Sequence, residues 1–183
     1  RVPMTGPLVV ASNHASYLDP MLLGAALPRP LAFLARKTLF DNLFFGWFIR
    51  SHFAFPLDRE GDIREALRSF SEQLAAGRAV VMFPEGTRTS TGKLADIKGG
   101  VAMIAAKNAA PVLPVYCWGS YLSWPRNRRW PRPQRLKALV GEPILPRPIQ
   151  TSAARKAEQA RIASATSEAL LALEVQAWEG EAP

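Results

Sequence analysis

Residues 62–83 read DIREALRSFSEQLAAGRAVVMF, and they carry the strongest signal of fold class in the chain. Apolar residues recur in the first part at spacings of three and four, which predicts a helix over Asp62–Ala76 with one buried face. Gly77 stands where a residue in the left-handed conformation commonly ends a helix. The continuous apolar run Ala79–Phe83 follows, and it is typical of a strand buried on both faces.

The same alternation of helix and strand extends in both directions from this stretch. Further strands are predicted at Leu8–Ala11, Leu31–Ala35, His52–Leu57, Val112–Trp118 and Arg135–Val140. Further helices are predicted from Asp19 to before Pro28 and at Thr38–Ile49, Gly100–Asn108 and Ser152–Trp178. This order predicts an α/β layered sandwich with a central, largely parallel mixed sheet flanked by helices.

Length and composition indicate one globular domain over residues 1–183. Hydrophobic residues make up 48% of the 183 residues and charged residues 21%, which excludes a disordered chain. The single cysteine, Cys117, cannot form an internal disulfide, and its apolar surroundings predict a small core residue. No stretch approaches the roughly 18 apolar residues of a membrane span, although we expect a membrane-binding segment upstream of Arg1.

The net charge of +8 lies entirely in one part of the chain. Between Ile97 and Gly141 there are eight Lys or Arg residues and no acid, and elsewhere the charges cancel. The densest part holds Arg126, Arg128, Arg129, Arg132, Arg135 and Lys137, with Trp124 and Trp130 among them. Such a stretch fits an anionic membrane surface, an anionic substrate, nucleic acid, or an ordinary solvated loop, and composition does not choose between them.

A histidine and an aspartate follow the first predicted strand, in Asn13–Asp19 (NHASYLD). At a turn from strand to helix His14 and Asp19 can meet, and a carboxylate against one imidazole nitrogen makes the other nitrogen a general base. Alternatively, Asp19 only caps the helix and His14 is an ordinary loop residue. The spacing by itself leaves both interpretations open.

Polar residues also follow two other predicted strands. Phe83–Thr89 (FPEGTRT) places Glu85, Thr87 and Arg88 around Gly86, either as an anion-binding loop or as a turn in which Arg88 pairs with Glu85. Phe55–Arg59 (FPLDR) ends in another arginine. Lys98 precedes the predicted helix at Gly100–Asn108 and is a weaker candidate for an anion contact.

Taken together, NHASYLD, FPLDR, FPEGTRT and the later APVLPV resemble, in order and spacing, the four sequence blocks of the glycerolipid acyltransferase family. This family comprises the 1-acylglycerol-3-phosphate acyltransferases and their relatives, and the resemblance spans about Val9 to Gly119. It implies an O-acyltransferase that moves a fatty acyl group from an acyl thioester to the free hydroxyl of 1-acylglycerol-3-phosphate, giving phosphatidate.

The resemblance also assigns roles to residues. His14 is expected to be the general base and Asp19 its orienting partner, and Pro114 belongs to the fourth block in the apolar acyl region. The expected substrate-binding residues are Asn13, Arg59, Glu85, Gly86, Thr87 and Arg88. No metal site is expected, because the chain has two histidines, His14 and His52, and no visible cluster of metal ligands. No cofactor is expected, and acyl-CoA or acyl carrier protein serves as a co-substrate.

The expected partners are an acyl thioester donor, a lysophospholipid acceptor and an anionic membrane surface, with no nucleic acid. The expected location is the cytoplasmic face of a membrane, peripheral or anchored by a segment absent from this chain. The aromatic segment Leu39–Phe48 is expected to help in membrane docking. Alternative functions are a sister acyltransferase acting on glycerol-3-phosphate or another lysolipid, a thioesterase, and a non-catalytic binder of anionic lipid.

Overall fold

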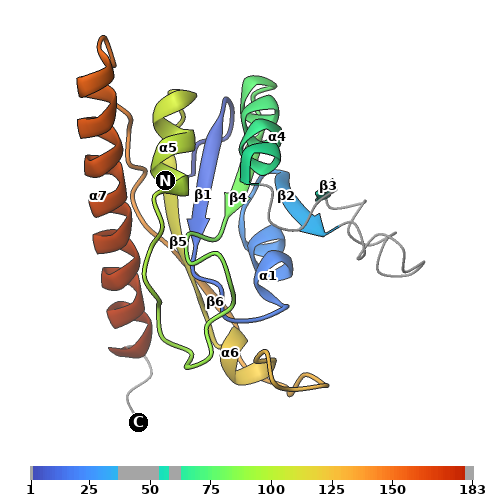
Figure 1. Ribbon diagram of the computed structural model, residues 1–183. Helices are drawn as coiled ribbons and strands as arrows, with labels where there is room; N and C mark the ends of the chain where they lie inside the picture. The colour runs from blue at the N-terminus through green and yellow to red at the C-terminus, as the bar shows by residue number, and fades with distance from the viewer. Residues whose placement is uncertain (1, 37–53, 58–62, 180–183) are drawn as a thin grey trace.

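A computed structural model describes residues 2–36, 54–57 and 63–179. The strands within these residues form one sheet in the order β3-β2-β4-β1-β5-β6 (Figure 1). Their bounds are β1 Leu8–Ser12, β2 Leu31–Arg36, β3 Ala54–Leu57, β4 Ala79–Met82, β5 Val112–Trp118 and β6 Lys137–Val140. The pairs β3–β2, β2–β4, β4–β1 and β1–β5 are parallel, and within the described residues only the pair β5–β6 is antiparallel. The predicted fold class, a largely parallel mixed sheet, is therefore confirmed.

Helices cover both faces of this sheet, as three layers. α1 (Asp19–Ala26) covers one face, where Leu23 packs with Val10 and Val81. The other face is covered by α4 (Ile63–Ala75), α5 (Gly100–Lys107) and α7 (Ser152–Glu179). β1 lies between the two cores and all five of its residues are buried, which explains the uninterrupted apolar run Leu8–Ala11 within it.

The described helices and strands begin and end within two residues of their predicted bounds. β5 matches its prediction at both ends, and α7 ends one residue later than predicted. The short helix α6 (Ser120–Ser123) was not predicted, because four residues carry no usable periodicity. The helix predicted at Thr38–Ile49 and the start of the strand predicted at His52 lie outside the described residues.

The 28-residue helix α7 runs along one side of the molecule, and its C-terminal end lies at the same end as α6 (Figure 1). Ile162 and Leu170 on this helix are completely buried. At its start, Glu158 accepts hydrogen bonds from the Arg147 backbone N–H and the Arg161 guanidinium, which lower the pKa of Glu158 to about 2. Within the described ranges, none of the helices has the length and apolar character needed to span a bilayer.

Gly119 turns the chain from β5 into α6 with φ of +82°, and a Cβ placed on it would lie 2.0 Å from the Arg135 carbonyl oxygen. Gly6 also has positive φ, at +76°, but a Cβ there would meet nothing within 4 Å. We predict that Gly6→Ala lowers the free energy of unfolding by about 1–2 kcal/mol from backbone strain. Gly119→Ala should lower it by roughly 2–5 kcal/mol, because overpacking against backbone adds to the strain.

Urea denaturation of both variants measures this difference. Equal destabilisation by the two substitutions would contradict the close approach of Gly119 to Arg135.

Candidate active site

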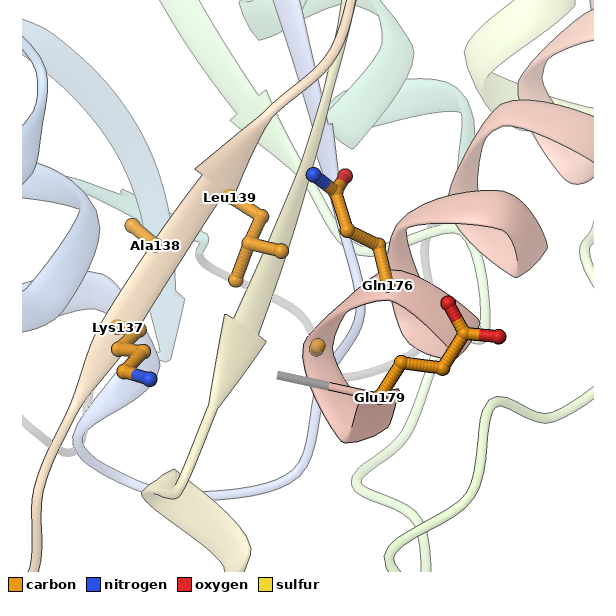
Figure 2. Close-up of a pocket in the computed structure, with 6 residues that line it drawn as sticks. Lys137, Ala138, Leu139, Gln176 and Glu179 are labelled. Atoms are coloured by element: carbon orange, nitrogen blue, oxygen red, sulfur yellow. The ribbon is translucent and has the colours of Figure 1, made fainter. Parts of the chain in front are cut away.

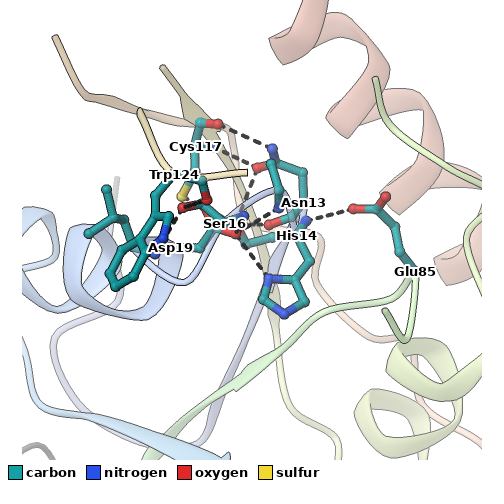
Figure 3. A network of polar contacts seen from close by, with 10 residues as sticks. Asn13, His14, Ser16, Asp19, Glu85, Cys117 and Trp124 are labelled. Carbon is teal, nitrogen blue, oxygen red and sulfur yellow. Dashed lines mark hydrogen bonds and ion pairs between the residues drawn. The ribbon is translucent and has the colours of Figure 1, made fainter. Parts of the chain in front are cut away.

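Three neighbouring strands end at one edge of the sheet and deliver the predicted site residues there. β4, β1 and β5 are adjacent and parallel, so the loops after them meet. The loop after β1 carries His14, the loop after β4 carries Glu85, and Cys117 lies near the end of β5 (Figure 3). This edge is where open α/β sheets generally place their ligands.

His14 and Asp19 meet at the start of α1, as the spacing allowed. The Nδ1 atom of His14 lies 2.9 Å from Oδ2 of Asp19. The same oxygen accepts the backbone N–H groups of Ala15 and Ser16, both at 2.7 Å. Asp19 therefore holds the loop before the helix, and it makes no side-chain hydrogen bond that caps α1.

The imidazole of His14 is fixed on its face as well as through Nδ1. Its ring stacks on Phe83 with a centroid distance of 4.0 Å and an angle of 16° between the planes. The His14 side chain is 21% exposed, whereas Asp19 is completely buried. No hydrogen bond to Nε2 occurs within the described residues, so this nitrogen remains available as a base.

Glu85 holds the backbone of the His14 loop from the other side. Its Oε1 accepts the His14 backbone N–H at 2.6 Å, and its Oε2 accepts the Ala95 N–H at 3.0 Å. Burial raises the pKa of Glu85, and the two backbone hydrogen bonds oppose that rise by stabilising the carboxylate. These contacts are internal, and a contact between Glu85 and substrate stays a prediction.

Asn13 likewise makes contacts within the protein. Its side-chain Oδ1 accepts the Cys117 N–H at 2.6 Å, and its Nδ2 donates to the Cys117 carbonyl at 3.1 Å. The amide thus joins the ends of β1 and β5, which fixes the origin of the His14 loop. Its predicted role in substrate binding stays a prediction.

The rest of the FPEGTRT segment is more open. Gly86, with φ of +74°, and Thr87 are exposed, and the Lys98 ammonium lies close to Gly86, within 2.9 Å of where a Cβ would stand. The Arg88 guanidinium lies 3.5 Å from the centre of the Tyr17 ring. Arg88 is therefore stacked on an aromatic ring and not paired with Glu85, within the residues described.

The sequence did not predict a contact between the His14 loop and Trp124, which lies just before the basic stretch Arg126–Lys137. The Ser16 hydroxyl donates to the Trp124 carbonyl at 2.8 Å, and the rings of Tyr17 and Trp124 are 5.3 Å apart. Tyr17 therefore lies between Arg88 and Trp124. Tyr17 lies in NHASYLD and Trp124 lies just before Arg126, and nothing local in the sequence shows that these two segments touch.

A cavity of about 660 Å³ opens beside this loop. Ala15 and Cys117 line it on the side of the site, and Glu174 of α7 contributes a carboxylate. The rest of its lining is largely aromatic and apolar and includes Tyr116, Trp118, Tyr121, Leu122, Val175 and Trp178. Such a lining suits an apolar ligand.

Two predicted residues remain, Arg59 and Pro114. Arg59 lies outside the described residues. Pro114 lies within β5, where it packs against Gly141, and it does not line the cavity. A separate hollow between β6 and the end of α7, near Lys137 and Gln176, shares no residue with the loops of His14 and Glu85 (Figure 2).

Across residues 2–36, 54–57 and 63–179, no cluster of three or more His, Cys, Asp or Glu side chains could hold a metal ion.

The acyltransferase family model matches residues 1–118, which include the loops of His14 and Glu85. The chain belongs to this family. It is 31% identical to the 1-acyl-sn-glycerol-3-phosphate acyltransferase of Bacillus subtilis over 145 residues, covering 79% of this chain and 70% of the relative. The corresponding enzyme of Streptococcus pneumoniae is 37% identical over 109 residues, covering 58% of this chain and 40% of the relative.

A solved structure agrees with both the sequence matches and the fold. The crystal structure of the 1-acyl-sn-glycerophosphate acyltransferase PlsC from Thermotoga maritima superposes with a TM-score of 0.68 at 29% identity. The match covers 91% of this chain and 68% of that one. The resemblance seen in the four sequence blocks is thus confirmed.

We predict that His14→Ala lowers the rate of acyl transfer about 10²- to 10⁴-fold, because it removes the general base. Asp19→Asn should lower kcat by about tenfold. The three donors on Oδ2 should orient the Asn carbonyl toward them, so mainly the charge that stabilises imidazolium is lost. Steady-state kinetics measure both effects, and circular dichroism checks the fold. Near-normal turnover of His14→Ala would contradict this role.

Proposed function

We propose that this chain transfers a fatty acyl group from an acyl thioester, on coenzyme A or acyl carrier protein, to 1-acylglycerol-3-phosphate, giving phosphatidate. The observation that carries the proposal is the imidazole of His14 held by buried Asp19, within a family whose relatives are named for this reaction. The matches cover 70% of the Bacillus relative and 40% of the streptococcal one. The activity is therefore proposed for residues 1–183 and is not taken over from the full-length relatives.

In the proposed mechanism, Nε2 of His14 takes the proton of the acceptor hydroxyl as that oxygen attacks the thioester carbonyl. The C–O bond forms, the C–S bond breaks, and the thiolate leaves with the proton from the imidazolium. The Asp19 carboxylate stabilises the imidazolium in between. A covalent intermediate on Cys117 is disfavoured, because burial raises the pKa of its thiol and little thiolate forms.

Arg88 is the proposed contact for the phosphate of the acceptor. One of its guanidinium nitrogens, Nη1, is buried without a hydrogen-bond partner among the described residues. An unpaired buried donor is destabilising, and a phosphate oxygen would satisfy it. Stacking on Tyr17 orients the guanidinium, and Lys98 adds a second cation nearby. Arg59 remains a further candidate from the second block.

The acyl chain is proposed to occupy the apolar cavity beside Ala15 and Cys117. This position places hydrocarbon against aromatic and aliphatic side chains while the thioester stays near His14. The exposed end of α7, including Val175 and Trp178, forms part of the same wall.

An assay of thiol release from acyl-CoA across a panel of acceptors tests the proposal. Release should depend on added lysolipid and be fastest with 1-acylglycerol-3-phosphate. Preference for glycerol-3-phosphate or another lysolipid would assign the chain to a sister activity. Release without any acceptor would indicate a thioesterase, and no release at all would favour a lipid-binding domain without catalysis.

We predict that Arg88→Ala raises the KM for the lysolipid acceptor about 10- to 150-fold, since a charge-assisted hydrogen bond contributes roughly 1.5–3 kcal/mol. Arg88→Lys should recover only part of the loss, because the planar fork is absent. Separate titrations of acceptor and donor provide the measurement. A rise in the donor KM alone would move Arg88 to the phosphates of the coenzyme.

We further propose that the basic stretch binds an anionic membrane surface on the cytoplasmic side. The basic stretch follows α6 and lies at the same end of the molecule as the carboxyl ends of β1 and β5 (Figure 1). Trp124, just before it, contacts Ser16 of the His14 loop. Five of the six basic residues in the stretch are exposed, Arg128 is partly buried, and Trp130 is 71% exposed. A lysolipid acceptor resides in a bilayer, so a surface here would bring it to the site.

We predict that Gln at Arg126, Arg128 and Arg129 weakens binding to anionic vesicles about 100-fold, given about 1 kcal/mol for each basic residue near such a surface. A matched control places Gln at Lys107, Arg155 and Lys156, which are exposed and lie outside Arg126–Lys137. Co-sedimentation at low and high salt measures binding, which should fade as salt screens the charges. Equal binding of both triple variants, or equal binding to neutral vesicles, would contradict the proposal.

A further inference from the structure

We propose that Glu174 of α7 is a positioning residue for His14, acting through the segment between Thr89 and Lys98. This inference rests on the proposed function in one respect, namely that His14 is the base. Glu174 lies beyond the last residue matched by the acyltransferase family model, so the family blocks do not assign it a role.

The first step is the contact of Glu174 with the segment itself. Its Oε1 accepts the backbone N–H of Leu94 at 3.0 Å and the hydroxyl of Tyr116 at 3.1 Å. A single carboxylate oxygen thus joins α7, the 89–98 segment and β5. Burial, reinforced by Glu174 itself, raises the pKa of Tyr116, so its phenol stays protonated and continues to donate.

The second step leads from this segment to the base. Ala95, the residue after Leu94, donates its N–H to Oε2 of Glu85 at 3.0 Å. The Oε1 of Glu85 accepts the N–H of His14 at 2.6 Å. Two adjacent N–H groups therefore bind two carboxylates, and the second carboxylate holds the backbone of the catalytic histidine.

The same segment touches His14 at a second point, because the Thr89 N–H donates to the His14 carbonyl at 2.8 Å. Residues 89–98 form neither helix nor strand, so the position of this segment depends largely on these hydrogen bonds. When Glu174 no longer reaches Leu94, Ala95 is expected to move, and the Glu85–His14 contact with it. A small misplacement of a catalytic group can reduce the rate as much as a hundredfold.

The test separates reach from charge with three variants in the full chain. Glu174→Gln keeps the length and an accepting oxygen but loses the charge. Glu174→Asp keeps the charge, but its carboxylate is shorter by one methylene and no longer reaches Leu94. Glu174→Ala removes both properties. Glu168→Ala is the matched control, since Glu168 lies on the same helix, is exposed, and accepts a hydrogen bond from the Ser164 hydroxyl.

We expect the Asp and Ala variants to lose 10- to 100-fold in kcat, with the donor KM nearly unchanged. The Glu168→Ala control should retain kcat within about threefold, and the Gln variant should lose clearly less than the Asp and Ala variants. Full activity of Glu174→Asp, or a Gln variant as impaired as Ala, would overturn the proposal. Because Asp and Gln are conservative, the comparison stands even where Glu174→Ala does not fold.

Amide hydrogen exchange gives a readout that does not depend on activity. Exchange at Leu94, Ala95 and His14 should be faster in Glu174→Asp than in the unaltered chain or in Glu168→Ala. Unchanged exchange at these amides would overturn the positioning role even where kcat falls. An unaltered chain with no acyl transfer to any lysolipid would refute the proposed function instead, and the exchange data would still judge the role of Glu174.

Discussion

Asp19 and Glu85 are two buried carboxylates that take up consecutive backbone N–H groups of the loop after β1. Glu85 accepts the N–H of His14, and Asp19 accepts those of Ala15 and Ser16. An ionised carboxyl removed from water is strongly destabilised unless donors surround it. The two carboxylates are therefore stabilised only while the loop presents these N–H groups to them, and the same hydrogen bonds hold the loop in this conformation. The imidazole of His14 is positioned by this mutual requirement and by Phe83 on its face.

The order of strands in the sheet makes that requirement possible. β1 lies between β4 and β5, so the loop carrying His14 has the loop of Glu85 on one side and Cys117 on the other. Asn13 joins β1 to β5 through both atoms of its amide, which fixes the point where the loop leaves the sheet. β1 is paired on both edges, with β4 and β5, and all five of its residues are buried, so its place inside the sheet agrees with its apolar sequence. The core and the site thus depend on the same pairing.

The helices, the strands and the His14–Asp19 contact could be predicted from the sequence, because local patterns encode them. The other contacts of the site could not, because they join distant segments. Periodicity and continuous apolar runs identify faces of helices and buried strands, and these predicted the sheet and most boundaries. The spacing of His14 and Asp19 is local, so their meeting could be anticipated. By contrast, the partner of Glu85 is a backbone N–H 71 residues away, and Glu174 reaches Leu94 across 80 residues. Such contacts arise from the packing of distant loops, which no local pattern encodes.

The arrangement of charge at the site follows from which groups bind the buried acids Asp19 and Glu85. Within the described residues, Asp19 and Glu85 are bonded to backbone N–H groups and to His14, not to Lys or Arg. Pairing of Arg88 with Glu85 would have consumed the cation, and an anionic ligand would first have had to break that pair. Stacking on Tyr17 orients the guanidinium, and its Nη1 atom has no hydrogen-bond partner among the described residues. Within the described residues, backbone N–H groups therefore stabilise the acids around His14, and no Arg88–Glu85 pair has to be broken before an anionic ligand can bind.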